Sequence, residues 1–313
     1  MYPKKSSNKS QSGAHHTVCG HWTMRHVKSI GKPLVAILFI ATQAIFTPAT
    51  AQKITIKSSQ GDVQAGSCTK PLYLTLDTGH MEIAPLVAEV LNKHQVKVTF
   101  FAANEKTKVG NGSLSQHWAP WWKARAAEGH DFASHTYDHV YWRGDIPRAS
   151  DGTTQFRIKP SAGAFEGREF TFDAKKYCAQ IDFANERLQD LTGKKPLPMF
   201  RAPGGKSSPA LLKVAKACGY EHVGWSPAGF LGDELSSATY PNKLLLSQAL
   251  KNIKTGDILL AHLGIWSRQD PWAPAVLEPL IVGLKEKGFC FQTMREHPTY
   301  KAWISQSTLT WPR

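Results

Sequence analysis

Two histidines four residues apart, His135 and His139, are the side chains of this chain best suited to hold a metal ion together. Residues i and i+4 lie one above the other on a helical turn, so this spacing predicts that both imidazoles point at one ion. Neutral imidazole is a common ligand of zinc and similar divalent metals, and a catalytic site needs one more protein ligand, often a carboxylate. The pair alone is a weak signal that gains weight from the polar residues that accompany it.

Three other polar residues lie at the ends of strand-like apolar runs. Asp77, Arg201 and His262 end the runs that begin at residues 71, 199 and 258. In a barrel of parallel strands, polar residues at the carboxyl ends of the strands face a common mouth. We therefore expect these three residues and the histidine pair to form one active site.

Strand-like and helix-like segments alternate along most of the chain. Apolar and β-branched runs predict strands at 71–76, 96–101, 131–134, 199–201, 221–226, 257–261 and 288–293. Helical periodicity predicts helices at 82–94, 118–128, 173–191, 209–217, 242–253 and 274–287. This alternation implies a parallel sheet in an α/β domain, and 313 residues suffice for one large barrel or doubly wound domain.

Residues 140–172 interrupt the alternation. Glycine, proline, serine and charged residues dominate there, and no clear period is visible. The segment predicts a long loop insertion within a single domain at 52–313, and long ordered loops tend to be functional.

Residues 1–51 have the pattern of a secretory signal peptide with its leader. Residues 1–33 carry six basic and no acidic residues, an apolar run covers about 34–46, and small residues lead to Ala51. This pattern predicts cleavage after Ala51, and Met24 is an alternative start that gives a signal of normal length. The other reading is an uncleaved anchor, although the run is short for a membrane span. We expect a secreted or periplasmic protein with no stable membrane span after cleavage.

The mature domain is basic. Removal of six basic residues with the leader lowers the formal net charge from +14 to +8. A basic surface favours anionic wall or envelope polymers as partners, and solubility alone explains the charge equally well. No stripe of Lys and Arg interleaved with aromatic residues is present, so we expect no binding to nucleic acid.

The cysteines predict disulfides. Cys19 leaves with the leader, and the four that remain allow three pairings in an oxidising compartment. Cys68 precedes the first strand and Cys290 lies in the last, and in a closed barrel these strands are neighbours. The pairing that follows is Cys68–Cys290 with Cys178–Cys218. The sequence contains no Cys-x-x-Cys motif, so we expect neither a redox role nor a structural zinc site for its cysteines.

The order of these motifs resembles the polysaccharide deacetylase family, the NodB-like carbohydrate esterases of family 4. That family carries an Asp-Asp pair after strand one, then His-x-x-x-His, Arg-x-Pro and Leu-x-Leu-x-His motifs. This chain offers Thr75-Leu76-Asp77-Thr78-Gly79, His135 to His139, Arg201-Ala202-Pro203 and Leu259-Leu260-Ala261-His262. Order and spacing agree from about residue 71 to 294. The resemblance implies a distorted, TIM-like (β/α) barrel of seven or eight strands.

The resemblance also implies roles for these residues. His135 and His139 hold a divalent metal, with zinc the first expectation, which activates a water and polarises the acetyl carbonyl. Asp77 serves as general base and Arg201 orients it. His262 is the general acid that protonates the departing amine.

The chain departs from the family pattern after its first strand. The second Asp of the family, its third metal ligand, is Thr78 here. Asp77 itself then completes a two-His, one-carboxylate site in the reading that we favour, which leaves the base unassigned. The alternatives are that the side chain of His80 or of Glu82 supplies the third metal ligand.

The Arg motif departs as well. Gly204 replaces its usual aromatic residue, and the N–H of Gly204 is expected to help bind the oxyanion. The stretch 225–229 lacks the acidic residue that customarily braces the Arg, and Asp233 is the nearest candidate.

Ordinary structural roles are open to the same residues. Asp77 suits an N-cap of the helix that begins near residue 82, His262 a core imidazole, and Arg201 a structural salt bridge. A further set, Trp118, Trp121 and Trp122 with Tyr141-Trp142, suits either the core or stacking on sugar rings.

The sequence thus predicts a metal-dependent hydrolase that removes N-acetyl groups from glucosamine units of a polysaccharide. Two alternatives stay open. One is a carbohydrate-binding relative that lost catalysis through the change at Thr78, and the other is an O-acetyl esterase, whose ester chemistry demands less of the metal.

Overall fold

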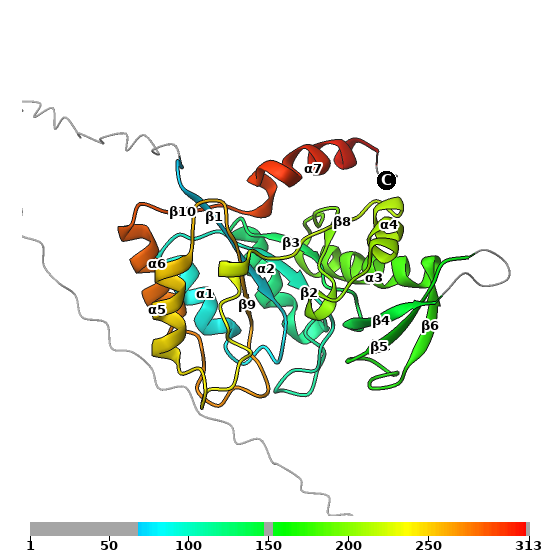
Figure 1. Ribbon diagram of the computed structural model, residues 1–313, viewed down its shortest axis with the longest axis horizontal. Helices are drawn as coiled ribbons and strands as arrows, with labels where there is room; N and C mark the ends of the chain where they lie inside the picture. The colour runs from blue at the N-terminus through cyan, green and yellow to red at the C-terminus, as the bar shows by residue number, and fades with distance from the viewer. Residues whose placement is uncertain (1–67, 147–152, 311–313) are drawn as a thin grey trace, which may run out of the picture. The chain divides into compact units, whose positions relative to one another are not determined.

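A computed structural model describes residues 68–146 and 153–310 of the chain (Figure 1). The predicted signal peptide, its cleavage after Ala51 and the start of the mature domain lie outside the described residues. Among the helices that are described, none is long and apolar enough to cross a membrane.

The central element is a curled parallel sheet. It contains β1 (Pro71–Asp77), β2 (Thr99–Ala102), β3 (Asp131–Ser134), β7 (Met199–Phe200), β8 (Glu221–His222), β9 (Ile258–His262) and β10 (Cys290–Phe291). Strands β1, β2, β3, β7 and β8 follow one another in that order, and β9 pairs with β1 on its other side. The segment after β8 returns to β9, where the N–H of Ser226 donates to the carbonyl of Ile258 at 3.0 Å. The sheet is therefore a distorted (β/α) barrel, which confirms the predicted fold.

Helices follow the strands as the alternation predicts (Figure 1). They are α1 (Ala84–Lys93), α2 (Ala119–Ala127), α3 (Ala174–Thr192), α4 (Pro209–Ala217), α5 (Asn242–Asn252), α6 (Leu277–Glu286) and α7 (Pro298–Thr310), with short 3₁₀ turns η1 (Gln116–Trp118), η2 (Pro203–Gly205), η3 (Pro227–Gly229) and η4 (Met294–Glu296). Helix α3 begins where Asp173 accepts from the N–H of Lys176, and it ends at Gly193, whose φ is +68°. Helix α7 was not predicted from the sequence.

The core lies between the sheet and the helices. Every residue of β1 from Leu72 to Asp77 is buried, as expected of a parallel strand covered on both faces. Trp122 is fully buried and donates its indole N–H to the carbonyl of Ser113 at 2.8 Å, and Trp121 packs edge-on against Phe100. Trp122 belongs to the core, so stacking on sugar is the wrong reading for it, and Trp121 is half-buried against the same core.

The expected loop insertion at 140–172 contains a second sheet. Three antiparallel strands, β4 (Val140–Ile146), β5 (Gln155–Pro160) and β6 (Phe170–Asp173), pair in sequence order. In β5 the side chains alternate, and Phe156 and Ile158 are buried in a cluster with Tyr177 of α3 and Phe200 of β7. This short period-2 pattern was hidden among charged residues, so the prediction of a loop without strands was wrong.

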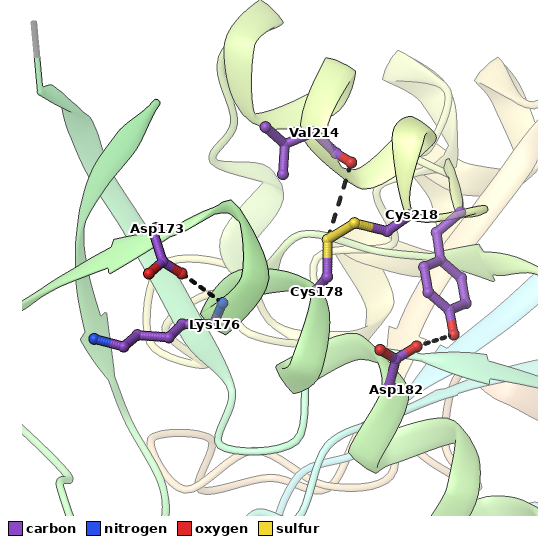
Figure 2. The surroundings of a disulfide bond; sticks show 7 residues. Asp173, Lys176, Cys178, Asp182, Val214 and Cys218 are labelled. Carbon is purple, nitrogen blue, oxygen red and sulfur yellow. Dashed lines mark hydrogen bonds between the residues drawn. A yellow bond between two sulfur atoms is a disulfide. The ribbon is translucent and has the colours of Figure 1, made fainter. Parts of the chain in front are cut away.

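Two disulfides have the predicted pairing. Cys68 is bonded to Cys290, and strand β10 lies directly beside the start of β1. Figure 2 shows the second bond, which joins Cys178 of α3 to Cys218, the residue after α4. The first bond ties the beginning of the barrel to its last strand, and the second ties two neighbouring helices together.

Candidate active site

The residues singled out in the sequence meet at the carboxyl ends of the parallel strands. Asp77, His135, His139 and His262 line one small cavity of about 100 Å³, together with Glu105, Tyr141, Gly204, Trp225, Glu234, Leu260 and Ile265. Arg201 is fully buried and pairs with Asp77 at the wall of this cavity. The side chains that were expected to share one site therefore do lie around one cavity.

The histidine pair is held by a tight turn and not by a helix. Thr136 and His139 have φ of +61° and +48°, which no right-handed helix accommodates. The N–H of His139 donates to the carbonyl of Thr136 at 3.2 Å, and the hydroxyl of Thr136 accepts from the N–H of Val140 at 2.8 Å. The helical geometry expected from the i, i+4 spacing was wrong, although its consequence, two facing imidazoles, holds. Left-handed backbone at a threonine is costly and is concentrated at functional sites.

The hydrogen bonds of the two imidazoles define which nitrogen is bare. Nδ1 of His135 lies 3.0 Å from the carbonyl of Arg201, which only accepts, so Nδ1 carries the proton. Ser161 Oγ lies 2.5 Å from Nδ1 of His139 and 3.3 Å from the carbonyl of His139, so it is placed to accept from Nδ1 while it donates to the carbonyl. With the proton on Nδ1 of both rings, the two Nε2 atoms, 3.2 Å apart, present lone pairs to an ion.

This arrangement fits a cation. Two nitrogens that bind one tetrahedral zinc at about 2.0–2.1 Å are roughly 3.3 Å apart, close to the spacing seen here. Metal-bound histidines generally donate their other N–H to an oxygen, as both do. Burial lowers the pKa of His135 well below its ordinary value, and the neighbouring His139 lowers it further, so its ring is neutral and able to ligate.

A third ligand is not yet in contact with both imidazoles. Oδ2 of Asp77 lies 3.4 Å from Nε2 of His135. As the side chains stand, the described residues contain no group of three His, Cys, Asp or Glu that already surrounds one ion position. The proposed participation of Asp77 as a ligand stays a prediction.

Asp77 and Arg201 form a buried ion pair. Nη1 of Arg201 donates to Oδ1 of Asp77 at 2.6 Å, and its other nitrogens donate to the carbonyls of Val223 and Gly224 at 3.1 Å. Helix α1 begins at Ile83 without a side-chain cap, so the capping role considered for Asp77 was wrong. Arg201 is therefore braced by Asp77 and by backbone carbonyls.

His262 is paired with Asp233. Its Nδ1 lies 3.1 Å from Oδ1 of Asp233, and its backbone N–H donates to Oδ2 at 2.6 Å. Burial alone lowers the pKa of His262, but the Asp233 carboxylate outweighs it and raises the pKa to about 9. Asp233 thus keeps His262 protonated, and the suggestion that Asp233 braces Arg201 was wrong.

Comparison with known proteins identifies the family. Residues 65–223 match the family model described as polysaccharide deacetylase. The chain belongs to the polysaccharide deacetylase family. The family predicted from the motifs is confirmed, and with it a carbohydrate-deacetylating enzyme.

Individual relatives of this polysaccharide deacetylase agree. The peptidoglycan-N-acetylglucosamine deacetylase of Bacillus cereus is 27% identical over 74% of this chain and 90% of its own length. The chitooligosaccharide deacetylase of Azorhizobium caulinodans is 25% identical over 71% of this chain and 92% of its own length. The structure of a family 4 acetyl xylan esterase from Clostridium thermocellum, in complex with a cobalt ion, has a TM-score of 0.53, 20% identity and coverage of 74% of this chain and 92% of that one. At that identity the last comparison shows the fold alone.

In this polysaccharide deacetylase the position after Asp77 is taken by Thr78, and a carboxylate from the segment after β2 lies beside it. Thr78 Oγ1 donates to Oε2 of Glu105 at 2.6 Å. The alternatives His80 and Glu82 line a different cavity beside Trp266, so neither lies where the third ligand is needed. Sequence reasoning missed Glu105, although it follows the strand β2 closely and the strand-end rule points to it.

Gly204 has a similar replacement. A Cβ on Gly204 would lie 2.9 Å from Cε1 of Tyr141, so the ring of Tyr141 occupies the space beside this glycine. Tyr141 belongs to β4 and contacts the ring of His139 edge-on at 4.9 Å between centroids. Burial raises the pKa of Tyr141, so its phenol stays protonated at neutral pH. The sheet β4–β6 therefore places an aromatic ring directly beside Gly204.

Proposed function

We propose that this polysaccharide deacetylase is a metal-dependent hydrolase that removes N-acetyl groups from glucosamine units of a polysaccharide. The observation that carries the proposal is the pair of bare Nε2 atoms 3.2 Å apart, flanked by the Asp77–Arg201 ion pair and by protonated His262. These are a cation site, a base and an acid around one cavity.

The residues divide the reaction among them. A divalent cation held by His135 and His139 would supply a Lewis acid for the acetyl carbonyl and lower the pKa of the attacking water. Asp77 accepts the proton of that water, because Arg201 fixes its carboxylate without protonating it.

The second half of the reaction needs an acid and an oxyanion site. Attack on the amide carbon gives a tetrahedral oxyanion, and the N–H of Gly204 at the cavity wall would stabilise it. His262 carries a proton at neutral pH and delivers it to the nitrogen of the leaving amine. The amine departs as the C–N bond breaks, and acetate remains.

The substrate class is supported by the names of the relatives. They act on peptidoglycan N-acetylglucosamine and on chitooligosaccharide, and both contain N-acetylglucosamine units. We propose the same unit for this chain, in a polymer outside the cytoplasm. The two disulfides support an oxidising compartment, as does the signal pattern at residues 1–51.

Acetate release from three substrates tests the proposal. The full chain, loaded with zinc, is incubated with N-acetylglucosamine oligomers, peptidoglycan and acetylated xylan. We expect acetate from the first two, because His262 is placed to protonate an amine leaving group. Release from xylan alone would replace the amidase proposal with an O-acetyl esterase, and glycan binding without any acetate would indicate a binding protein.

A further inference from the structure

The segment that follows β2 carries a carboxylate that no motif of the chain accounts for. Glu105 is half-buried and lines the same cavity as His135 and His139. We propose that Glu105 is the third protein ligand of the metal site, in place of the carboxylate that Thr78 lacks. This inference rests on the metal-dependent function proposed above.

The sheet topology places Glu105 between the two halves of the site. Strand β2 pairs with β1 on one side and with β3 on the other. The N–H of Thr78 donates to the carbonyl of Phe101 at 3.1 Å, and the N–H of His135 donates to the carbonyl of Ala102 at 2.9 Å. The chain that leaves β2 therefore runs between the residue that lost its carboxylate and the histidine pair.

The backbone around Glu105 is fixed on both sides. The N–H of Asn104 donates to the carbonyl of Tyr137, inside the histidine turn, at 2.7 Å. The N–H of Glu105 donates to the hydroxyl of Ser113 at 3.0 Å, and its carbonyl accepts from the N–H of Ser113 at 2.8 Å. A ligand on such a segment is positioned before the ion binds.

Thr78 orients the Glu105 carboxylate. Its Oγ1 accepts from the N–H of Ala103 at 3.0 Å, so its hydroxyl proton is free to point at Oε2 of Glu105, 2.6 Å away. Metal-binding carboxylates are commonly held in this way by a hydrogen bond to one oxygen. In the described part of the chain no hydrogen bond or ion pair reaches Oε1 of Glu105, which leaves that atom for the ion.

The assignment also leaves Asp77 for catalysis. Oδ1 of Asp77 accepts a hydrogen bond from Arg201, whose positive charge already pairs with this carboxylate. We therefore assign Asp77 the role of base and not that of metal ligand. The imidazoles of His135 and His139 and the carboxylate of Glu105 form a His₂-carboxylate set, which is a common catalytic zinc site. Every role in the site then has its own residue.

Zinc affinity separates this proposal from its rivals. The full chain is stripped with a chelator and titrated with zinc by calorimetry, as wild type, Glu105→Gln, Asp77→Asn, Thr78→Val and Glu89→Gln, the last an exposed control on α1. Loss of a residue that hydrogen-bonds a metal ligand costs about 10–100-fold in metal affinity, so we expect about 10-fold for Thr78→Val and about 100-fold or more for loss of the ligand itself in Glu105→Gln. Asp77→Asn and Glu89→Gln should bind close to wild type.

A rescue variant distinguishes the loss of a metal ligand from misfolding. Thr78→Asp combined with Glu105→Gln returns a carboxylate to the position next to Asp77 and should restore most of the zinc affinity. Thermal unfolding of each metal-free variant reports whether it folds.

Two results would overturn the assignment. Wild-type zinc affinity in Glu105→Gln, with the loss found in Asp77→Asn, would make Asp77 the ligand and leave the metal-dependent function standing. A wild-type chain that binds no zinc, copper, nickel or cobalt would end both proposals.

Discussion

At the scale of single residues, the charged partners of Asp77 and His262 distinguish the proposed base from the proposed acid. Asp77 is held by a guanidinium, whereas His262 is held by the carboxylate of Asp233. The Asp233 carboxylate favours the charged form of His262, so the chemistry starts with a protonated acid.

The pH dependence follows from His262. An acid with a pKa of about 9 is protonated below that pH, so activity should be lost as the pH rises through about 9. In Asp233→Asn the opposing carboxylate is gone and burial keeps the pKa at or below the ordinary 6.5. The alkaline limb of kcat should then move down to about pH 6.5 or lower, with a loss of roughly 30-fold at pH 8.

Glu234→Gln is the matched control for this pH profile. Glu234 is exposed and raises the pKa of His262 less than Asp233 does, so its removal should shift the limb only slightly. An alkaline limb that is the same in Asp233→Asn and wild type would contradict the role of His262 as the acid.

Arg201 is the residue whose loss should cost most stability. It is fully buried, and Arg201→Met leaves Asp77 and the carbonyls of Val223 and Gly224 without their donors. Breaking a buried ion pair from one side costs about 3–5 kcal/mol, which urea unfolding measures. Lys123→Met on the exposed face of α2 is the control, with a change within about 0.5 kcal/mol. A similarly small loss in Arg201→Met would show that water replaces the guanidinium.

At the scale of elements, the features that could be predicted were those that depend on the hydrophobic period and on the order of the strands. Strand ends identified Asp77, His135, Arg201 and His262, because the β/α alternation is regular enough to place them at one face. The turn at Thr136 was missed, since left-handed φ at a threonine has no sequence signature. The role of Tyr141 was missed because it depends on a contact between β4 and the turn after β7, whereas Glu105 lies three residues beyond the end of β2 and carries no motif that marks it.

The contact between β4 and the turn after β7 makes a prediction at this scale. Gly204→Ala places a Cβ at 2.9 Å from Tyr141 Cε1 and at a φ of +61°. Left-handed backbone at a residue other than glycine costs about 1–2 kcal/mol, and the clash with Tyr141 adds to it. Unfolding measurements should show a smaller penalty for Gly204→Ala in a Tyr141→Ala background. Equal penalties in both backgrounds would mean that the ring moves aside freely.

At the scale of the whole molecule, closure of the barrel depends on its two ends. Cys68–Cys290 spans a sequence separation of 222 residues and joins the start of β1 to β10. Removing a native disulfide typically costs about 2–5 kcal/mol, so Cys68→Ser/Cys290→Ser should unfold at lower denaturant while kcat at 25 °C is retained. A loss of kcat without a loss of stability would mean that the disulfide shapes the site, which lies at the opposite ends of the strands.

The barrel and both disulfides were predictable at this scale because they follow from strand order. Helix α7 was not, since its residues show no amphipathic period that separates a buried face from an exposed one. The sheet β4–β6 was not predicted because its buried face is defined by packing against α3, which the sequence pattern does not reveal. The elements that could be predicted from the sequence were therefore those with a regular hydrophobic period.

Two imidazoles and a carboxylate are expected to hold a catalytic metal in this site. The direct measurement is acetate release from N-acetylglucosamine oligomers by the full chain as purified, after chelation and after zinc is restored, with zinc content measured each time. We expect activity that disappears with the metal and returns with it. Acetate release that is unchanged at a metal content near zero would contradict it.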